Sequence, residues 1–182
     1  MKVHPQHHAL MLACVLTCAQ PFAAFAKPAA PLPFEGSWRS CFTLRDGTGS
    51  AYDGHKICTG YDLVQRGQNV CGTWSEFATG IYEGRLQAVA TDKTHAQWTS
   101  ICGRTGSETN TECQTSEDEG APQAWEAINQ PLQLCKGRLL VGNDSCTVQH
   151  AKQGYRKHHL SHAQRTELLA EPWMQQCLSR TP

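Results

Sequence analysis

The chain has 182 residues, of which 40% are hydrophobic, and its 16 basic side chains balance its 16 acidic ones. A chain without excess positive charge lacks the basic surface that displaces counterions from a phosphate backbone, so we expect no nucleic-acid partner. Its ten cysteines indicate a disulfide framework formed in an oxidising compartment.

Residues 1–26 predict a cleavable export signal. Lys2 precedes an apolar run over 9–19, which is too short to cross a bilayer. The small side chains of Ala24 and Ala26 fit a signal peptidase, so the mature chain is expected to begin near Lys27. We expect a periplasmic or secreted protein without membrane insertion after cleavage. A retained anchor or a lipoprotein is the alternative.

The mature chain predicts one domain with a short lead-in. Residues 27–34 include three prolines, a composition typical of an extended chain. Residues 35–182 suffice for one core but are short for two, so we expect a single disulfide-stapled domain.

Alternation of apolar and polar residues predicts consecutive antiparallel strands. The first contains Trp38 to Arg45, and further strands are expected at 57–65, 70–77, 81–90 and 95–102. The polar, acidic segment 103–124 predicts an exposed loop. Strand-like pieces return at 124–128, 132–136, 139–141 and 146–149. The expected fold class is mainly β, an antiparallel meander that forms a small barrel or a sandwich.

The end of the chain predicts a short helix over about 160–178. Ser161 and Gln164 have the spacing of a capping box, and Pro172 can occupy the first position of a further helical turn. Cys177 would fasten this helix to the sheet.

Eight cysteines remain after the signal is removed, and an even number permits full pairing. They are Cys41, Cys58, Cys71, Cys102, Cys113, Cys135, Cys146 and Cys177. Their placement favours the pairs Cys41–Cys58, Cys71–Cys177, Cys102–Cys113 and Cys135–Cys146. A Cys71–Cys102 pair, with Cys177 bonded elsewhere, is the rival arrangement. No Cys-x-x-Cys pair occurs, which argues against a thioredoxin-type or zinc-ribbon motif.

Residues 36–102 resemble the calycin-type secreted barrels. Gly36-Ser37-Trp38 is similar to the Gly-x-Trp opening of lipocalins, and Val70-Cys71-Gly72-Thr73-Trp74 resembles a hairpin pattern of avidin-type barrels. The resemblance implies a barrel whose closed end is plugged by Trp38 and which binds a small ligand or a protein. In size, export and architecture the chain is also similar to small secreted inhibitors of bacterial wall-degrading enzymes.

Aromatic and polar side chains on the meander are the candidates for a ligand pocket. We single out Trp74, Tyr82, Arg85 and Trp98 as ligand-binding candidates. The alternative interpretation is that the tryptophans are ordinary core residues of an antiparallel sheet.

Other patterns give weaker hypotheses. His158, His159 and His162 could share a metal ion, and the polar turns at 46–54 and 117–119 could offer oxygens to calcium. Glu76 and Glu83 form a nominal carboxylate pair for glycoside cleavage. We predict no metal site, no cofactor and no catalytic residue, because none of the common catalytic motifs is present.

The sequence therefore predicts an exported, non-enzymatic binding protein for a small ligand or a protein partner. One alternative is a periplasmic inhibitor or immunity-type protein that presents the 103–124 loop to an enzyme. Another is a hydrolase whose catalytic residues are dispersed along the chain.

Overall fold

The computed structural model describes residues 32–45, 47, 53–78, 80–103, 125–143 and 145–181. These residues belong to one compact unit spanning Pro31–Pro182. The predicted export signal, the loop 104–124 and Cys113 lie outside the described residues.

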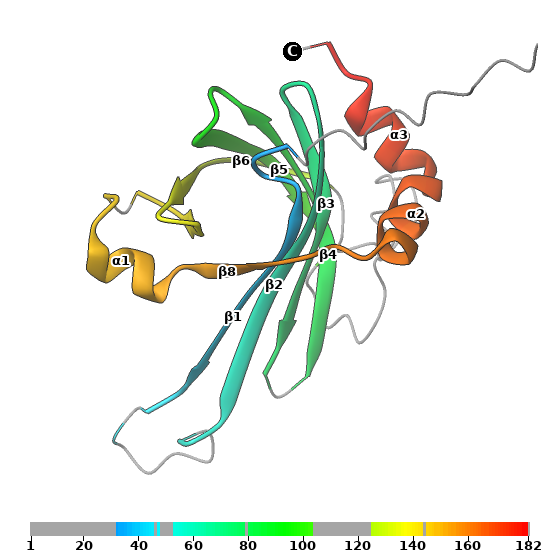
Figure 1. Cartoon of the computed structure of the whole chain (residues 1–182). Coiled ribbons are helices and arrows are strands. Elements are labelled where there is room, and N and C mark those ends of the chain that lie inside the picture. The colour runs from blue at the N-terminus through cyan, green and yellow to red at the C-terminus, as the bar shows by residue number, and fades with distance from the viewer. Residues whose placement is uncertain are drawn as a thin grey trace, which may run out of the picture. The chain divides into compact units, whose positions relative to one another are not determined.

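The strands form a closed barrel in which each strand pairs with its neighbours in sequence order (Figure 1). All pairs are antiparallel. The strands are β1 (Gly36–Thr43), β2 (Lys56–Arg66), β3 (Asn69–Phe77), β4 (Ile81–Ala90), β5 (His95–Cys102), β6 (Glu126–Cys135), β7 (Arg138–Val141) and β8 (Tyr155–His158). The predicted antiparallel meander is confirmed, and of the two predicted architectures the barrel is the one observed.

The barrel is closed by a strand that sequence reasoning missed. β8 pairs with β1 through Ser37 and His158, and with β7 through Leu139 and Tyr155. The strand expected at 146–149 is wrong, because α1 (Val148–Gln153) begins there. Thr147 caps this helix by accepting a hydrogen bond from the His150 backbone N–H at 3.1 Å.

Two predicted strand pieces, 124–128 and 132–136, form the single strand β6. Pro131 lies between the two pieces, and proline has no backbone N–H to give to a ladder. In the structure Pro131 pairs with Gln97, and its carbonyl accepts a hydrogen bond from the Gly142 N–H at 2.9 Å. The strand continues through Pro131 because this residue contributes its carbonyl oxygen, which proline retains, to the hydrogen bonding of the sheet.

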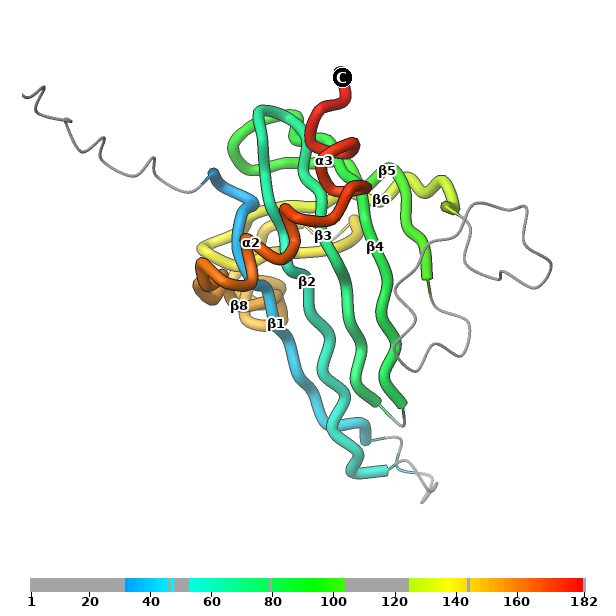
Figure 2. Tube along the Cα trace, turned by 90° about the vertical axis from the view of Figure 1, so that its right-hand side faces the viewer, coloured from blue at the N-terminus to red at the C-terminus, as the bar shows by residue number. Residues whose placement is uncertain are grey.

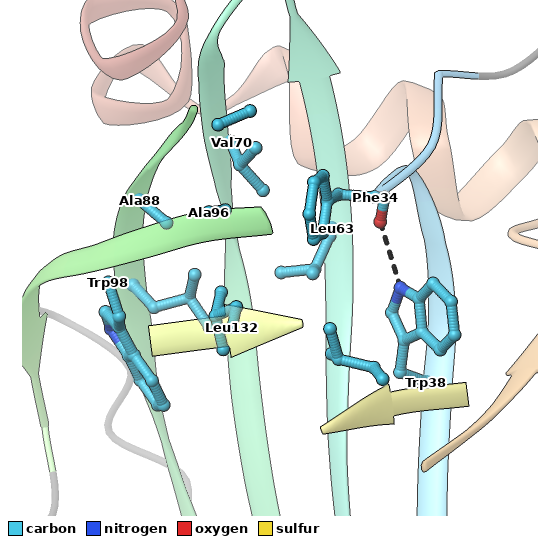
Figure 3. Close-up of a cluster of buried hydrophobic side chains, with 11 residues drawn as sticks. Phe34, Trp38, Leu63, Val70, Ala88, Ala96, Trp98 and Leu132 are labelled. Carbon is cyan, nitrogen blue, oxygen red and sulfur yellow. Dashed lines mark hydrogen bonds between the residues drawn. The ribbon is translucent and has the colours of Figure 1, made fainter. Parts of the chain in front are cut away.

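The core fills the barrel interior with one face of each long strand. Figure 3 shows side chains from β1 to β6 pointing into this shared space. Its fully buried members include Phe34, Trp38, Leu63 and Leu86. The Trp38 indole N–H donates to the Phe34 carbonyl at 2.9 Å. The core thus begins at Phe34, the last residue of the predicted lead-in.

Two helices, rather than the one predicted, cover the outer face of the barrel. They are α2 (His162–Ala170) and α3 (Pro172–Leu178), separated at Glu171. Both predicted helix starts are confirmed, since Ser161 and Gln164 form a capping box and Pro172 opens α3. None of the helices in the described part of the chain is long and apolar enough to cross a membrane.

A second apolar cluster fixes α3 to β3, the strand beside it in Figures 1 and 2. Met174 and Leu178 are buried there against Val64, and Cys71 forms a disulfide with Cys177. At about 25 cal/mol per Å² of apolar surface, burial of such side chains stabilises the fold by roughly 1.5–3 kcal/mol each.

Three predicted disulfides are confirmed, namely Cys41–Cys58, Cys71–Cys177 and Cys135–Cys146. The rival Cys71–Cys102 pair is therefore wrong. Cys102 is itself disulfide-bonded. Its predicted partner, Cys113, lies outside the described residues.

Removing the long-range disulfide should destabilise the protein more than removing a short-range one. Cys71 and Cys177 lie 106 residues apart, whereas Cys135 and Cys146 lie 11 apart. Because the entropy lost by the unfolded chain grows with loop length, we expect Cys71→Ala/Cys177→Ala to cost about 4–5 kcal/mol and Cys135→Ala/Cys146→Ala about 3 kcal/mol. Urea unfolding of both variants measures the difference, and equal losses would contradict the loop-length explanation.

Candidate functional site

A half-open cavity of about 180 Å³ interrupts the packed interior of the barrel. It is lined by residues of β2, β3 and β5. The lining residues are Thr59, Tyr61, Trp74, Ser75, Glu76, Trp98 and Ile101. Two of the four predicted ligand-binding residues, Trp74 and Trp98, therefore meet at one site.

The other two predicted residues do not line this cavity. Tyr82 lies opposite Glu76 in the β3–β4 register but is not part of the lining. Arg85 lines a separate groove on the outer face, with its guanidinium 4.9 Å from the centre of the Trp173 ring. The structure thus places Arg85, the predicted polar ligand-binding residue, at a different site from Trp74 and Trp98.

A β-bulge in β5 brings Trp98 and Ile101 into the same cavity. In a regular strand, residues three apart point to opposite faces. The register with β4 shifts so that Trp98 pairs with Ala88 and Ser100 with Gln87, which leaves Thr99 unpaired. The Trp98 indole N–H donates to the Ser100 carbonyl at 3.0 Å, which fixes the ring beside the bulge.

The Trp74 ring is held against the backbone of the neighbouring strand. Its indole N–H donates to the Cys102 carbonyl at 3.2 Å, and the ring lies over Gly84. A Cβ atom at Gly84 would collide with both the Trp74 indole and the Cys102 carbonyl oxygen. Position 84 therefore needs glycine because of close approach, not because of its backbone angles.

Tyr61 completes the aromatic wall and is supported by Tyr155, which does not itself line the cavity. The Tyr61 ring meets Trp98 edge-on, with ring centres 5.6 Å apart, and Tyr155 on β8 lies 4.9 Å from Tyr61. The Tyr155 hydroxyl accepts a hydrogen bond from Thr59 at 3.1 Å and lies 3.4 Å from the Tyr61 hydroxyl. Tyr155 was not among the predicted residues, because it lies on the strand that sequence reasoning missed.

The Tyr61 phenol keeps its proton to a higher pH than an exposed tyrosine does, because its pKa is raised. Burial is the main cause that raises its pKa above 10.0, followed by its electrostatic interaction and hydrogen bond with Tyr155 and by the charge of Glu76. The cavity thus combines aromatic faces and neutral hydroxyls with one carboxylate.

The predicted carboxylate pair does not form. Glu76 pairs with Tyr82 and Ser75 pairs with Glu83, so alternation along β3 and β4 sends the two glutamates to opposite faces. Glu76 lines the cavity, whereas Glu83 does not. The two carboxylates therefore do not face one glycosidic bond, and this pair offers no glycosidase geometry.

The outer groove, of about 300 Å³, lies between α2, α3 and the barrel wall. Asp62, Arg85 and Glu171 of its lining each have a charged partner. Arg39 donates to both carboxylate oxygens of Asp62 at 2.8 Å, and Arg85 lies 3.7 Å from Glu171. We interpret the groove as the polar seam between the helices and the barrel.

No group of three or more His, Cys, Asp or Glu side chains in the described ranges is arranged to hold a metal ion. These ranges include the histidine set His158, His159 and His162. The hypothetical calcium turns at 46–54 and 117–119 lie partly or wholly outside the described residues.

Comparison of the chain with protein-family models, with curated proteins and with solved structures found no match.

An alanine at position 84 should displace Trp74. We expect Gly84→Ala to destabilise the protein by about 1–3 kcal/mol, because the new methyl group is forced into the indole and a strand carbonyl. Urea unfolding gives the loss, and near-ultraviolet circular dichroism reports the altered tryptophan environment. Thr73→Ala, which shortens a side chain on the outer face, is the control and should cost less than about 1 kcal/mol.

Tyr61 should make the protein less stable at high pH. Stabilisation from its neutral phenol is fully present below the unfolded-state pKa near 10. As the pH rises above that value, the unfolded chain loses the proton first, so the free energy of unfolding falls by up to about 1.4 kcal/mol per pH unit. Tyr61→Phe should flatten this slope in urea unfolding between about pH 9 and about pH 11. The control Tyr82→Phe leaves this hydroxyl pair intact, and identical slopes in wild type and Tyr61→Phe would contradict the assignment.

Proposed function

We propose that this protein is an exported, non-enzymatic binding protein that takes a small ligand in the barrel cavity. The observation that carries the proposal is the cavity itself, an opening of about 180 Å³ walled by Tyr61, Trp74 and Trp98 beside the buried core of the barrel. Aromatic walls with a few placed polar groups are typical of small-molecule sites.

The cavity is preorganised. Both indole N–H groups are bonded to backbone carbonyls, and the Thr59 hydroxyl donates to Tyr155. Rings that are already fixed lose little conformational freedom when a ligand arrives, which favours binding.

Export is supported by the three disulfides of the described residues, because such bonds persist in oxidising compartments. We propose a periplasmic or secreted location on this basis together with the predicted signal. The eight-stranded antiparallel order and the burial of Trp38 support the proposed relation to calycin-type barrels. A protein partner bound through the 103–124 loop stays a prediction, since residues 104–124 are not described.

A fragment screen tests whether the cavity binds small molecules. We expect some fragments that fit about 180 Å³ to raise the melting temperature and to change the tryptophan fluorescence, because a ligand that binds only the folded state stabilises it. The same fragments should bind at least about tenfold more weakly to Ile101→Trp, whose larger side chain fills the cavity.

Two outcomes would contradict the proposal. One is a screen in which no fragment binds the wild-type protein. The other is a set of fragments that bind Ile101→Trp, checked by circular dichroism to be folded, as tightly as they bind the wild type.

A further inference from the structure

We propose that the ligand of the barrel cavity is a small organic cation, an amine or a quaternary ammonium compound. This inference rests on the proposed function and adds the chemical class of the ligand. It is carried by three aromatic side chains and one carboxylate, Glu76, that line the cavity, with no basic side chain among the described lining residues.

The aromatic walls favour positive charge. The face of an aromatic ring carries negative electrostatic potential, and a cation within about 6 Å of the ring centre is attracted to it. Tyr61, Trp74 and Trp98 come from three different strands and line the same cavity. Such an arrangement is the form in which proteins recognise quaternary ammonium groups.

The hydrogen-bonding groups of the wall point to the same class of ligand. The indole N–H groups of Trp74 and Trp98 are already given to the carbonyls of Cys102 and Ser100. The two N–H groups therefore stay with the protein and do not serve as donors to a ligand. An anionic ligand would find few donors here, whereas an ammonium group would find acceptors.

Glu76 supplies the negative charge. Within the described part of the chain, no hydrogen bond or ion pair engages its carboxylate, so the group is available to a ligand. Two arginines of the barrel are close to other carboxylates. Arg39 on β1 pairs with Asp62, and Arg85 on β4 lies near Glu171 at the outer groove.

The size of the cavity limits the ligand to a small head group. A volume of about 180 Å³ corresponds to roughly six water molecules at about 30 Å³ each. The trimethylammonium group of choline, or the amine and part of the ring of phenylethylamine, is of this size. Because the cavity is half-open, a longer ligand could extend toward solvent.

The test compares cations with neutral molecules of the same shape. Choline is paired with dimethylbutanol, in which carbon replaces the nitrogen, and phenylethylamine is paired with phenylethanol. Isothermal titration calorimetry of the full mature chain, with its disulfides intact, gives the four affinities. We expect at least one cation to bind about tenfold or more tightly than its neutral partner.

Matched variants assign the preference to the cavity. Glu76→Gln keeps the size of the side chain and removes its charge, so it should weaken cation binding about tenfold and leave the neutral partner within about twofold. Trp74→Leu should also weaken cation binding while keeping an apolar wall. Glu167→Gln makes the same charge change at the outer groove and should leave all affinities unchanged. Circular dichroism and melting temperature verify that each variant is folded.

The outcomes separate this inference from the proposed function. If the neutral partners bind as tightly as the cations, or if Glu76→Gln binds cations like the wild type, the cation inference is overturned while ligand binding in the cavity stands. If none of the four compounds binds but the fragment screen yields neutral or anionic ligands blocked by Ile101→Trp, the cation inference fails alone. If neither experiment finds a ligand, both proposals fail.

Discussion

The backbone pairing of β8 with both β1 and β7 is the constraint on which the rest of the structure depends. With β8 in place the sheet has no free edge between its first and seventh strands, and the inner faces of all strands enclose one space. This strand is only four residues long, so its position has to be set by what precedes it. The Cys135–Cys146 disulfide and α1 turn the chain back toward the barrel, and Gly154 passes close to Leu140 where a side chain would collide.

The candidate site is a consequence of this closure. Tyr155 on β8 contacts Thr59 and Tyr61 of β2, so the strand that closes the sheet also supports the aromatic wall. The cavity is left where the small residue Gly84 lies under an indole and where a bulge turns two β5 residues the same way. Local irregularities in an otherwise regular barrel thus create the opening, which is a common origin of binding sites next to bulges.

The outer face serves stability instead. There α3 buries Met174 against β3, and the Cys71–Cys177 bond links segments far apart in the chain. Charged residues of the helical segment and the barrel lie close together there, as Arg85 of β4 and Glu171 do at 3.7 Å. Arg85 takes no part in the cavity although it follows Gly84, which faces inward. Side chains alternate along β4, so that of Arg85 points outward.

The sequence by itself determined the features that depend on local pattern. Period-two alternation located the first five strands, and the Ser161 capping box and Pro172 located two helix starts. Cysteine placement predicted the three disulfides that the structure describes. Only the tertiary structure decided the rest. β8 is too short and too polar to show a strand pattern in the sequence, and its pairing depends on contacts with a strand distant in sequence. The bulge at Thr99 changes which face a side chain takes, and the composition of the cavity follows from register between strands. A turn and the hydrophobic pattern set the register of a hairpin, but no turn joins β8 to β1, so the register of that pair depends on closure of the whole sheet.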